Sequence, residues 1–116
     1  MQLLDRNANS DIQSLVKQFD CISALKALGE ENRLRIVRML LDKPFSVNEI
    51  AEHLGLTQYN VSKHLRILRE AGLLETEKNG QQRLYGLATD FRSHLNANDH
   101  VLDLGCCVFH FDKLPQ

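Results

Sequence analysis

The stretch Thr57–Gly72 reads TQYNVSKHLRILREAG, and it decides the fold. Val61, Leu65 and Leu68 recur at the spacing that places side chains on one face of a helix. Thr57 is a favourable N-cap residue, and Gly72 stands where a left-handed residue commonly ends a helix. The pattern therefore predicts an amphipathic helix whose two ends are both defined by the sequence.

A short helix is predicted directly before this one. Ser46 and Glu49 have the spacing of a capping box, in which the side chain of each residue binds the backbone N–H of the other. Gly55 is expected to end that helix, so only Gly55 and Leu56 separate it from Thr57. Two helices joined by such a short turn containing glycine are the signature of a helix-turn-helix.

A β-hairpin is predicted directly after this pair of helices. Residues 73–78 and 81–87 mix polar and apolar side chains as strands do, and Asn79-Gly80 separates them. Asn-Gly in this setting is the strongest short-range hairpin signal, with the two residues forming a type I′ turn. An isolated hairpin is only marginally stable, so this one is expected to pack on the helices as a wing.

Two helical regions are expected before the helix-turn-helix, over residues 11–28 and 30–42. Both have apolar residues at the helical period, and glycine at position 29 ends the first. A kink near Asp20-Cys21 would divide the first region into two helices. The predicted architecture is thus mainly helical.

The C-terminal segment departs from this helical pattern. Thr89 or Asp90 is expected to cap a short helix that runs to Leu95, and a loop should follow over residues 96–99. Residues 101–111 are apolar and rich in Val, Phe and Cys, which favours an extended segment over a long helix. A segment so apolar is expected to pack on its own domain or on a partner subunit.

Length and composition fit one globular domain, because 116 residues with 43% hydrophobic side chains can build a substantial core. We predict a mainly α fold with a small β-hairpin, a winged helix-turn-helix over residues 11–95. A flexible N-terminus over residues 1–10 precedes it, and an apolar tail containing cysteines follows over residues 96–116.

The chain shows no sign of membrane insertion or secretion. No apolar run approaches the ~20 residues that span a bilayer, and the polar N-terminus does not resemble a secretory signal. Three cysteines are an odd number that does not indicate a structural disulfide framework. A cytoplasmic location is therefore predicted.

The front of the helix that begins after Thr57 offers side chains that form hydrogen bonds, only one of them charged. Such a helix suits the reading of base edges in the major groove of double-stranded DNA. The expected base-contacting residues are Gln58, Tyr59, Asn60, Ser62 and Lys63. The expected phosphate-contacting residues are Thr57, His64, Arg66, Lys78 and Arg83.

The formal net charge of −1 gives no global signature of nucleic-acid binding. The charge is unevenly distributed, because residues 57–83 carry five basic against three acidic side chains. The positive field is therefore local, and a dimer would double it. The overall charge leaves open a protein-interaction module that uses a winged-helix scaffold without binding DNA.

From Ile22 to Leu87 the chain resembles the ArsR/SmtB family of bacterial winged-helix repressors. Three segments carry the resemblance: LKALGEENRLRIV at 25–37, TQYNVSKHL at 57–65 and GQQRLYGL at 80–87. The resemblance implies a homodimer on an operator with two-fold symmetry, released from DNA when an effector binds. It also implies that Gln58, Tyr59, Ser62 and Lys63 face DNA, in agreement with the periodicity.

The sensor sites of that family do not carry over. Where arsenic-type members have a Cys-x-Cys pair, this chain has Ser46–Glu49 without cysteine. The zinc-type pattern also fails, because Asp90 and His94 are four residues apart and His100 has no partner at the required spacing. Zinc binding at the usual His and Asp positions is therefore not expected.

The three cysteines are the candidate sensor. Thiolates of Cys21, Cys106 and Cys107 would suit a thiophilic ion such as As(III) or Sb(III). Redox sensing through a reversible vicinal or intersubunit disulfide is a second hypothesis. The third hypothesis is structural: the cysteines fill the interior as small buried hydrophobes. In that case the protein would bind DNA without any effector.

No phosphate-binding glycine loop or nucleophile–base pattern is present in the sequence, so an enzyme is not expected. The sequence predicts a homodimeric, sequence-specific regulator of transcription, most simply a repressor.

Overall fold

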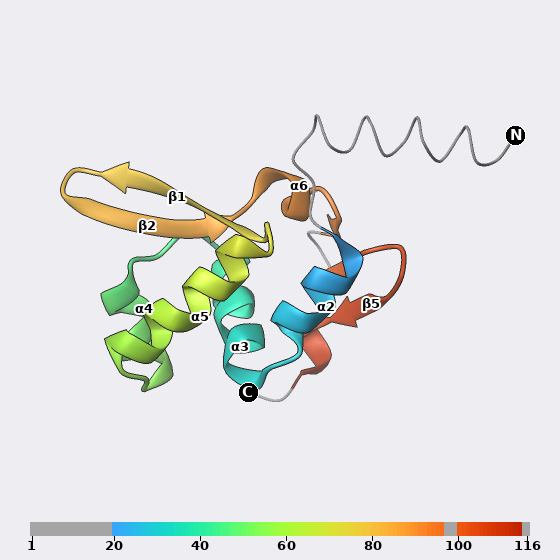
Figure 1. Cartoon of the computed structure of the whole chain (residues 1–116), viewed down its shortest axis with the longest axis horizontal. Helices are drawn as coiled ribbons and strands as arrows, with labels where there is room; N and C mark the ends of the chain where they lie inside the picture. The colour runs from blue at the N-terminus through green and yellow to red at the C-terminus, as the bar shows by residue number, and fades with distance from the viewer. Residues whose placement is uncertain (1–19, 97–99, 115–116) are drawn as a thin grey trace, which may run out of the picture.

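The computed structural model describes residues 20–96 and 100–114 (Figure 1). The predicted flexible N-terminus, residues 1–10, and the first part of the helical region predicted over residues 11–28, residues 11–19, lie outside these ranges. The helices are α2 (Cys21–Leu28), α3 (Glu31–Leu40), α4 (Val47–Leu54), α5 (Gln58–Glu70), α6 (Thr89–Arg92) and the 3-10 helix η1 (Phe111–Lys113). The strands are β1 (Leu74–Asn79), β2 (Gln82–Leu87), β3 (Leu95–Asn96), β4 (Val101–Asp103) and β5 (Val108–His110).

The ends of α4 and α5 form as the sequence predicts. The backbone N–H of Ser46 donates to the Glu49 carboxylate at 2.9 Å, and the Glu49 N–H donates to the Ser46 hydroxyl at 3.3 Å. Thr57 accepts from the N–H of residue 60 at 3.1 Å, which satisfies a donor that the helix leaves unpaired. Gly55 and Gly72 have φ of 70° and 83°, so the backbone leaves both helices through the left-handed region. The predicted helix-turn-helix is confirmed.

One hydrophobic core joins the helices. The predicted stripe of α5, Val61, Leu65 and Leu68, has no solvent-exposed surface. Ile36 of α3 and Ile50 of α4 are likewise fully buried. Burial of this stripe against α2, α3 and α4 fixes which face of α5 remains in water.

The wing is present, but its turn differs by one residue from the prediction. Asn79 pairs with Gln82, so the two-residue loop is Gly80-Gln81 and not Asn79-Gly80. Gly80 has φ of 67°, whereas Gln81 does not have a positive φ. A type II′ turn places glycine at its first central position for this reason, whereas a type I′ turn needs positive φ at both. The predicted type I′ turn is therefore wrong.

The wing is fastened to the segment between α3 and α4. The backbones of Phe45 and Tyr85 exchange two hydrogen bonds, of 3.0 and 2.8 Å. Gly86 is buried against Pro44, and a Cβ at this position would approach the Pro44 ring to 3.2 Å. The hairpin thus obtains from the helical domain the packing that it lacks alone.

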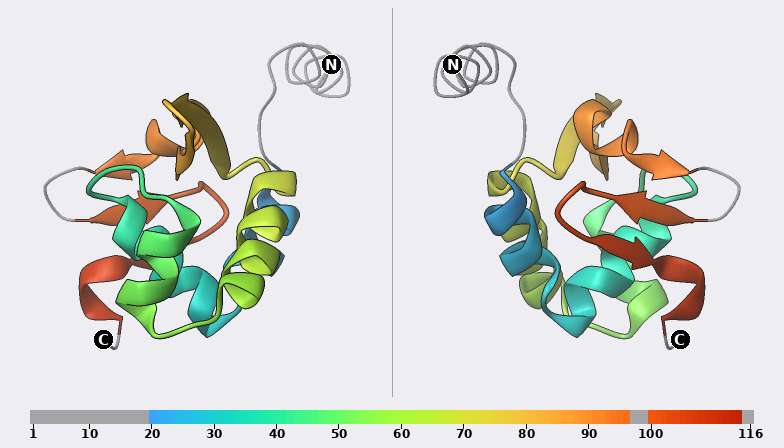
Figure 2. Two further views of the ribbon diagram at one scale, coloured as in Figure 1. Left: turned by 90° about the vertical axis from the view of Figure 1, so that its left-hand side faces the viewer. Right: turned by 90° about the vertical axis from the view of Figure 1, so that its right-hand side faces the viewer.

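The C-terminal segment is extended, as predicted, and forms an antiparallel sheet in the order β3-β4-β5. Leu102 and Phe111 are fully buried in the core, and Arg38 of α3 donates to the Leu114 carbonyl at 3.0 Å. In both views of Figure 2 the loop between β4 and β5 reaches toward α2. Leu102 and Phe111 of the apolar tail are therefore covered by its own domain, whereas Val108 is exposed.

Three local predictions in this region are wrong. The predicted short helix does not run to Leu95, because α6 ends at Arg92 and Leu95 pairs with Leu102 in strand β3. Helix α6 begins after Ala88, whose side chain has no oxygen, so neither Thr89 nor Asp90 caps it. The Thr89 hydroxyl donates instead to the Glu75 carboxylate at 3.4 Å. Asn96 belongs to strand β3 and not to a loop, and the rest of the predicted loop, residues 97–99, lies outside the described residues. Within residues 20–96 and 100–114 no helix is long and apolar enough to cross a membrane.

Candidate nucleic-acid interface and cysteine site

The N-terminal half of α5 presents a polar face to solvent. The five side chains predicted to contact bases are all exposed: Gln58, Tyr59, Asn60, Ser62 and Lys63. Tyr59 is 73% exposed although it is aromatic, and the Lys63 ammonium lies 5.6 Å from the centre of its ring. An aromatic residue left in water next to a cation is available for contact with a partner.

The positive side chains of the wing lie at the same end of the molecule as this face. Lys78 and Arg83 pair across the hairpin near its tip, and both are exposed. In Figure 1 the tip of the wing and the start of α5 are both on the left-hand side. The fold therefore brings together cations and hydrogen-bonding groups that are 15 or more residues apart in the sequence.

Arg66, one turn further along α5, is held by an intrahelical ion pair. Its Nε lies 3.2 Å from Oε2 of Glu70, four residues later, and the two side chains are 74% and 63% exposed. Such an exposed pair contributes little to stability and exchanges readily with other partners. A phosphate oxygen would compete with Glu70 for this guanidinium.

His64 differs from the other residues predicted to contact phosphate. Its side chain is only 16% exposed, with Nε2 3.4 Å from the Glu30 carboxylate and Nδ1 3.3 Å from the Arg33 guanidinium. Arg33 also donates from Nε to the Ala27 carbonyl at the end of α2. His64 thus ties α5 to the corner between α2 and α3. Its place next to Leu65, at the margin of the buried stripe, is the sequence signal for this position.

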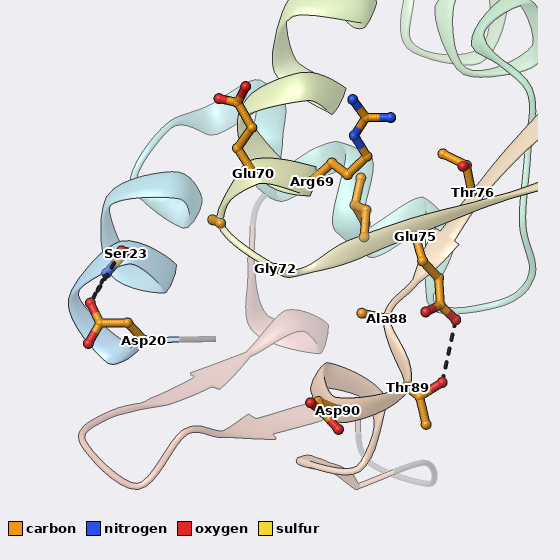
Figure 3. Close-up of a pocket in the computed structure, with 12 residues that line it drawn as sticks. Asp20, Ser23, Arg69, Glu70, Gly72, Glu75, Thr76, Ala88, Thr89 and Asp90 are labelled. Atoms are coloured by element: carbon orange, nitrogen blue, oxygen red, sulfur yellow. Dashed lines mark hydrogen bonds between the residues drawn. The ribbon is translucent and has the colours of Figure 1, made fainter. Parts of the chain in front are cut away.

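An acidic cleft lies at the other end of α5 (Figure 3). Its volume is about 910 Å³, and it lies between the start of α2, the end of α5, β1 and α6. Arg69 is accompanied there by four carboxylates, those of Asp20, Glu70, Glu75 and Asp90. The anionic cleft lies at the base of the wing, whereas Lys78 and Arg83 lie near its tip, so a net charge of −1 is compatible with a local positive surface.

The structure brings the three cysteines together. Cys21, at the start of α2, forms a disulfide with Cys106 in the β4–β5 loop, and their Cα atoms are 6.7 Å apart. Cys107 is a free thiol whose Sγ lies 4.0 Å from Sγ of Cys106. Cys106 is exposed, whereas Cys21 and Cys107 are half-buried.

This arrangement corrects two of the hypotheses drawn from the sequence. The disulfide is neither vicinal nor between subunits, because it joins α2 and the tail of a single chain. Cys106 is also not a buried core residue, since it lies on an exposed loop. The odd number of cysteines gave no indication of a disulfide in the sequence. Only the tertiary fold brings Cys21 next to Cys106.

The oxidation state of these sulfurs sets how many thiols the chain offers. Among the residues that the structure describes, no group of three or more His, Cys, Asp or Glu side chains is arranged to hold a metal ion. Two of the sulfurs are joined to each other, so the oxidised chain offers a single thiol there. Reduction of the disulfide would supply the three thiols that a thiophilic ion prefers.

Comparison with known proteins identifies the family. The family model described as "Bacterial regulatory protein, arsR family" matches residues 30–76. The transcriptional activator HlyU of Vibrio cholerae is 38% identical over 85 residues, which cover 72% of this chain and 79% of that protein. The arsenical resistance operon repressor of Staphylococcus xylosus is 31% identical over 85 residues, covering 71% and 82%.

A solved structure agrees with these sequence matches. The homodimeric winged helix-turn-helix DNA-binding domain Mb0332 of Mycobacterium bovis has a TM-score of 0.59 to this chain at 27% identity, covering 77% of this chain and 76% of that one. The named relatives are regulators of transcription and not enzymes, in agreement with the expectation from the sequence. The chain therefore belongs to the ArsR family of bacterial transcriptional regulators, and its winged helix-turn-helix is a DNA-binding fold.

Proposed function

We propose that this regulator binds a two-fold symmetric operator as a homodimer in the cytoplasm, and that the oxidation state of Cys21 and Cys106 controls its affinity for DNA. The disulfide between these two residues is the observation that supports the control. It links the start of α2 to the C-terminal tail, while the end of α2 contacts α5 through Arg33 and His64. Helix α2 is thus joined to the cysteine site at its start and to α5 at its end.

The proposed DNA contacts follow from exposure and charge. The exposed face of α5 enters the major groove, where Gln58, Tyr59, Asn60, Ser62 and Lys63 meet base edges. Arg66, Lys78, Arg83 and the hydroxyl of Thr57 contact phosphates on either side. His64 takes part only if its contacts with Glu30 and Arg33 are broken, so we assign it a positioning role. Two recognition helices in a dimer would lie ~34 Å apart, on half-sites ~10 bp apart.

Oxidation changes how α2 is held. When a two-electron oxidant such as a peroxide removes two electrons and two protons from the thiols, the Cys21–Cys106 bond fixes the start of α2 to the β4–β5 loop. In the reduced chain α2 is held by its buried side chains, chiefly Ala24, Ala27 and Leu28. A change in the position of α2 is transmitted to α5 through the Arg33–His64 contact.

The redox experiment uses a duplex selected from a random library for binding to the reduced protein. Fluorescence anisotropy then compares oxidised and reduced protein at one salt concentration. We expect the dissociation constant to change by about tenfold or more, which corresponds to about 1.4 kcal/mol of coupling. The Cys21→Ser variant should bind identically after oxidising and reducing treatments. Equal affinity of oxidised and reduced wild-type protein, with the disulfide verified by mass spectrometry, would refute the control.

A thiophilic ion is a second candidate effector. The gathering of Cys21, Cys106 and Cys107 favours it, because three reduced sulfurs suit As(III) or Sb(III). The similarity to a protein named as an arsenical resistance operon repressor also supports it. Arsenite added to the reduced protein should lower its affinity for the selected duplex. Unchanged affinity with arsenite in excess would remove this effector.

Salt dependence tests the phosphate contacts one residue at a time. Each contact that releases a counterion contributes about 0.9 to the slope of log affinity against log salt. Lys78→Ala and Arg83→Ala should each lower the slope by about this amount if the side chain reaches a phosphate. Lys26→Ala is the matched control, because Lys26 is exposed on α2, outside the proposed contact surface. An unchanged slope excludes the substituted residue from the phosphate contacts.

A further inference from the structure

The third cysteine, Cys107, lies beside the Cys21–Cys106 disulfide but is not part of it. Sγ of Cys107 lies 4.0 Å from Sγ of Cys106, which is bonded to Cys21. The two residues are neighbours in a tight loop, where the N–H of Leu104 donates to the Cys107 carbonyl at 2.9 Å. A second bond, from the N–H of Gly105 to the Asp103 carboxylate at 2.9 Å, also braces the loop. The thiol is therefore held close to the disulfide by local structure.

We propose that Cys107 is an internal exchange thiol that opens the Cys21–Cys106 disulfide, an inference that rests on the proposed control by these cysteines. Cys107 first loses its proton to solvent, and its thiolate attacks Sγ of Cys106. A bond forms between the sulfurs of Cys106 and Cys107 while the Cys106–Cys21 bond breaks. The electron pair leaves with the Cys21 sulfur, which takes up a proton from water. The number of disulfides stays at one, so the step needs neither an oxidant nor a reductant.

Exposure and proximity favour attack at Cys106, so that Cys21 is the sulfur released. Cys106 is exposed and is the sulfur that Cys107 contacts. Sγ of Cys21 lies 4.0 Å from the Leu104 carbonyl oxygen, which can accept the weak hydrogen bond of the Cys21 thiol once the released sulfur has taken up its proton from water.

Exchange would release α2 from the tail without a reductant reaching the half-buried Cys21. The chain would then hold two disulfide isomers, one in which α2 is fastened to the β4–β5 loop and one in which it is free. Cys107 would be the residue that interconverts them. A chain with Cys21 and Cys106 alone would have only the fastened form until an external thiol opened it.

The test measures which of the three cysteines carries the free thiol, by alkylation of the oxidised protein. Protein oxidised with diamide, and then freed of the reagent, is incubated at mildly alkaline pH with iodoacetamide, and the labelled peptides are quantified by mass spectrometry. The parallel samples are Cys107→Ser and Cys107→Ala. In the wild type we expect label on Cys21 as well as on Cys107, since alkylation traps each thiol as exchange exposes it. Label on Cys21 should be at least about tenfold higher than in either variant, and independent of protein concentration.

Two results would overturn the proposal. In one, the label is confined to Cys107 in the wild type and the Cys21–Cys106 peptide pair stays intact. In the other, all three cysteines are fully labelled after oxidation, so that no disulfide is available for exchange. Loss of the proposed control is distinguishable, because it appears only in the DNA-binding assay. If Cys21 is alkylated but oxidised and reduced protein bind DNA equally, the exchange is supported and the proposed redox control is refuted.

Discussion

Reduction of the Cys21–Cys106 disulfide should lower the free energy of unfolding by several kcal/mol. The two cysteines are 85 positions apart, so the bond closes most of the chain into one loop. The chain-entropy relation gives about 4.6 kcal/mol for a loop of this length, and measured disulfides commonly contribute about 2–4 kcal/mol. The stabilisation arises mainly from restricting the unfolded chain, so the native core should be unchanged.

Urea denaturation followed by helical circular dichroism measures this difference. With a slope of about 1–3 kcal/mol per molar urea, a loss of 3 kcal/mol moves the midpoint by about 1–3 M. Oxidised and reduced wild-type protein are compared with Cys21→Ser, which should match the reduced form under both conditions. Cys107→Ser is the control that keeps the disulfide and should behave as the wild type. Coincident midpoints of oxidised and reduced protein would contradict the reasoning.

Three further outcomes are expected. Phe111→Ala, measured in the reduced protein, should lower the free energy of unfolding by about 3–5 kcal/mol because Phe111 is fully buried. Val108→Ala is the control, because this half-exposed position should change the free energy of unfolding by no more than about 0.5 kcal/mol. A tail that folds separately from the helices would make both variants unfold like the wild type when followed by helical circular dichroism. Hydrogen bonds from the backbone and hydroxyl of the N-cap serine hold the pKa of Glu49 below its usual 4.5, so its contribution to stability is present above pH 4.5 and is lost as pH falls through the lowered pKa. Glu49→Gln should therefore flatten the dependence of the urea midpoint on pH in this acidic range, and an unaltered dependence would show that other carboxylates cause it. Glu70→Gln should tighten DNA binding about 1.5- to 5-fold by freeing Arg66 for phosphate, and the same gain in an Arg66→Ala background would show that the effect does not pass through Arg66.

The recognition helix could be predicted because its determinants are local. The N-cap at Thr57 and the stripe Val61, Leu65 and Leu68 set its start and its buried face. The burial of that stripe leaves the opposite side chains in water, so the exposed polar face follows from the same periodicity. The wing could be predicted for the same reason, although its turn lies one residue later than the Asn79-Gly80 signal indicates. Both positions of the turn contain Gly80, and cross-strand pairing decides between them.

The sequence by itself determined α4 and α5, their caps, the helix-turn-helix and the exposed polar side of α5, because hydrogen bonds and periodicities within a few residues specify them. Only the tertiary structure decided where the tail goes and which sulfurs meet. Residues 21 and 106 become neighbours because Leu102 and Phe111 are buried in the core, which carries the β4–β5 loop to α2. Burial of apolar side chains is non-directional, so a sequence shows that such a segment must be covered without showing against what. The proposed recognition surface could therefore be predicted from the sequence, whereas the proposed switch depends on a contact that exists only after folding.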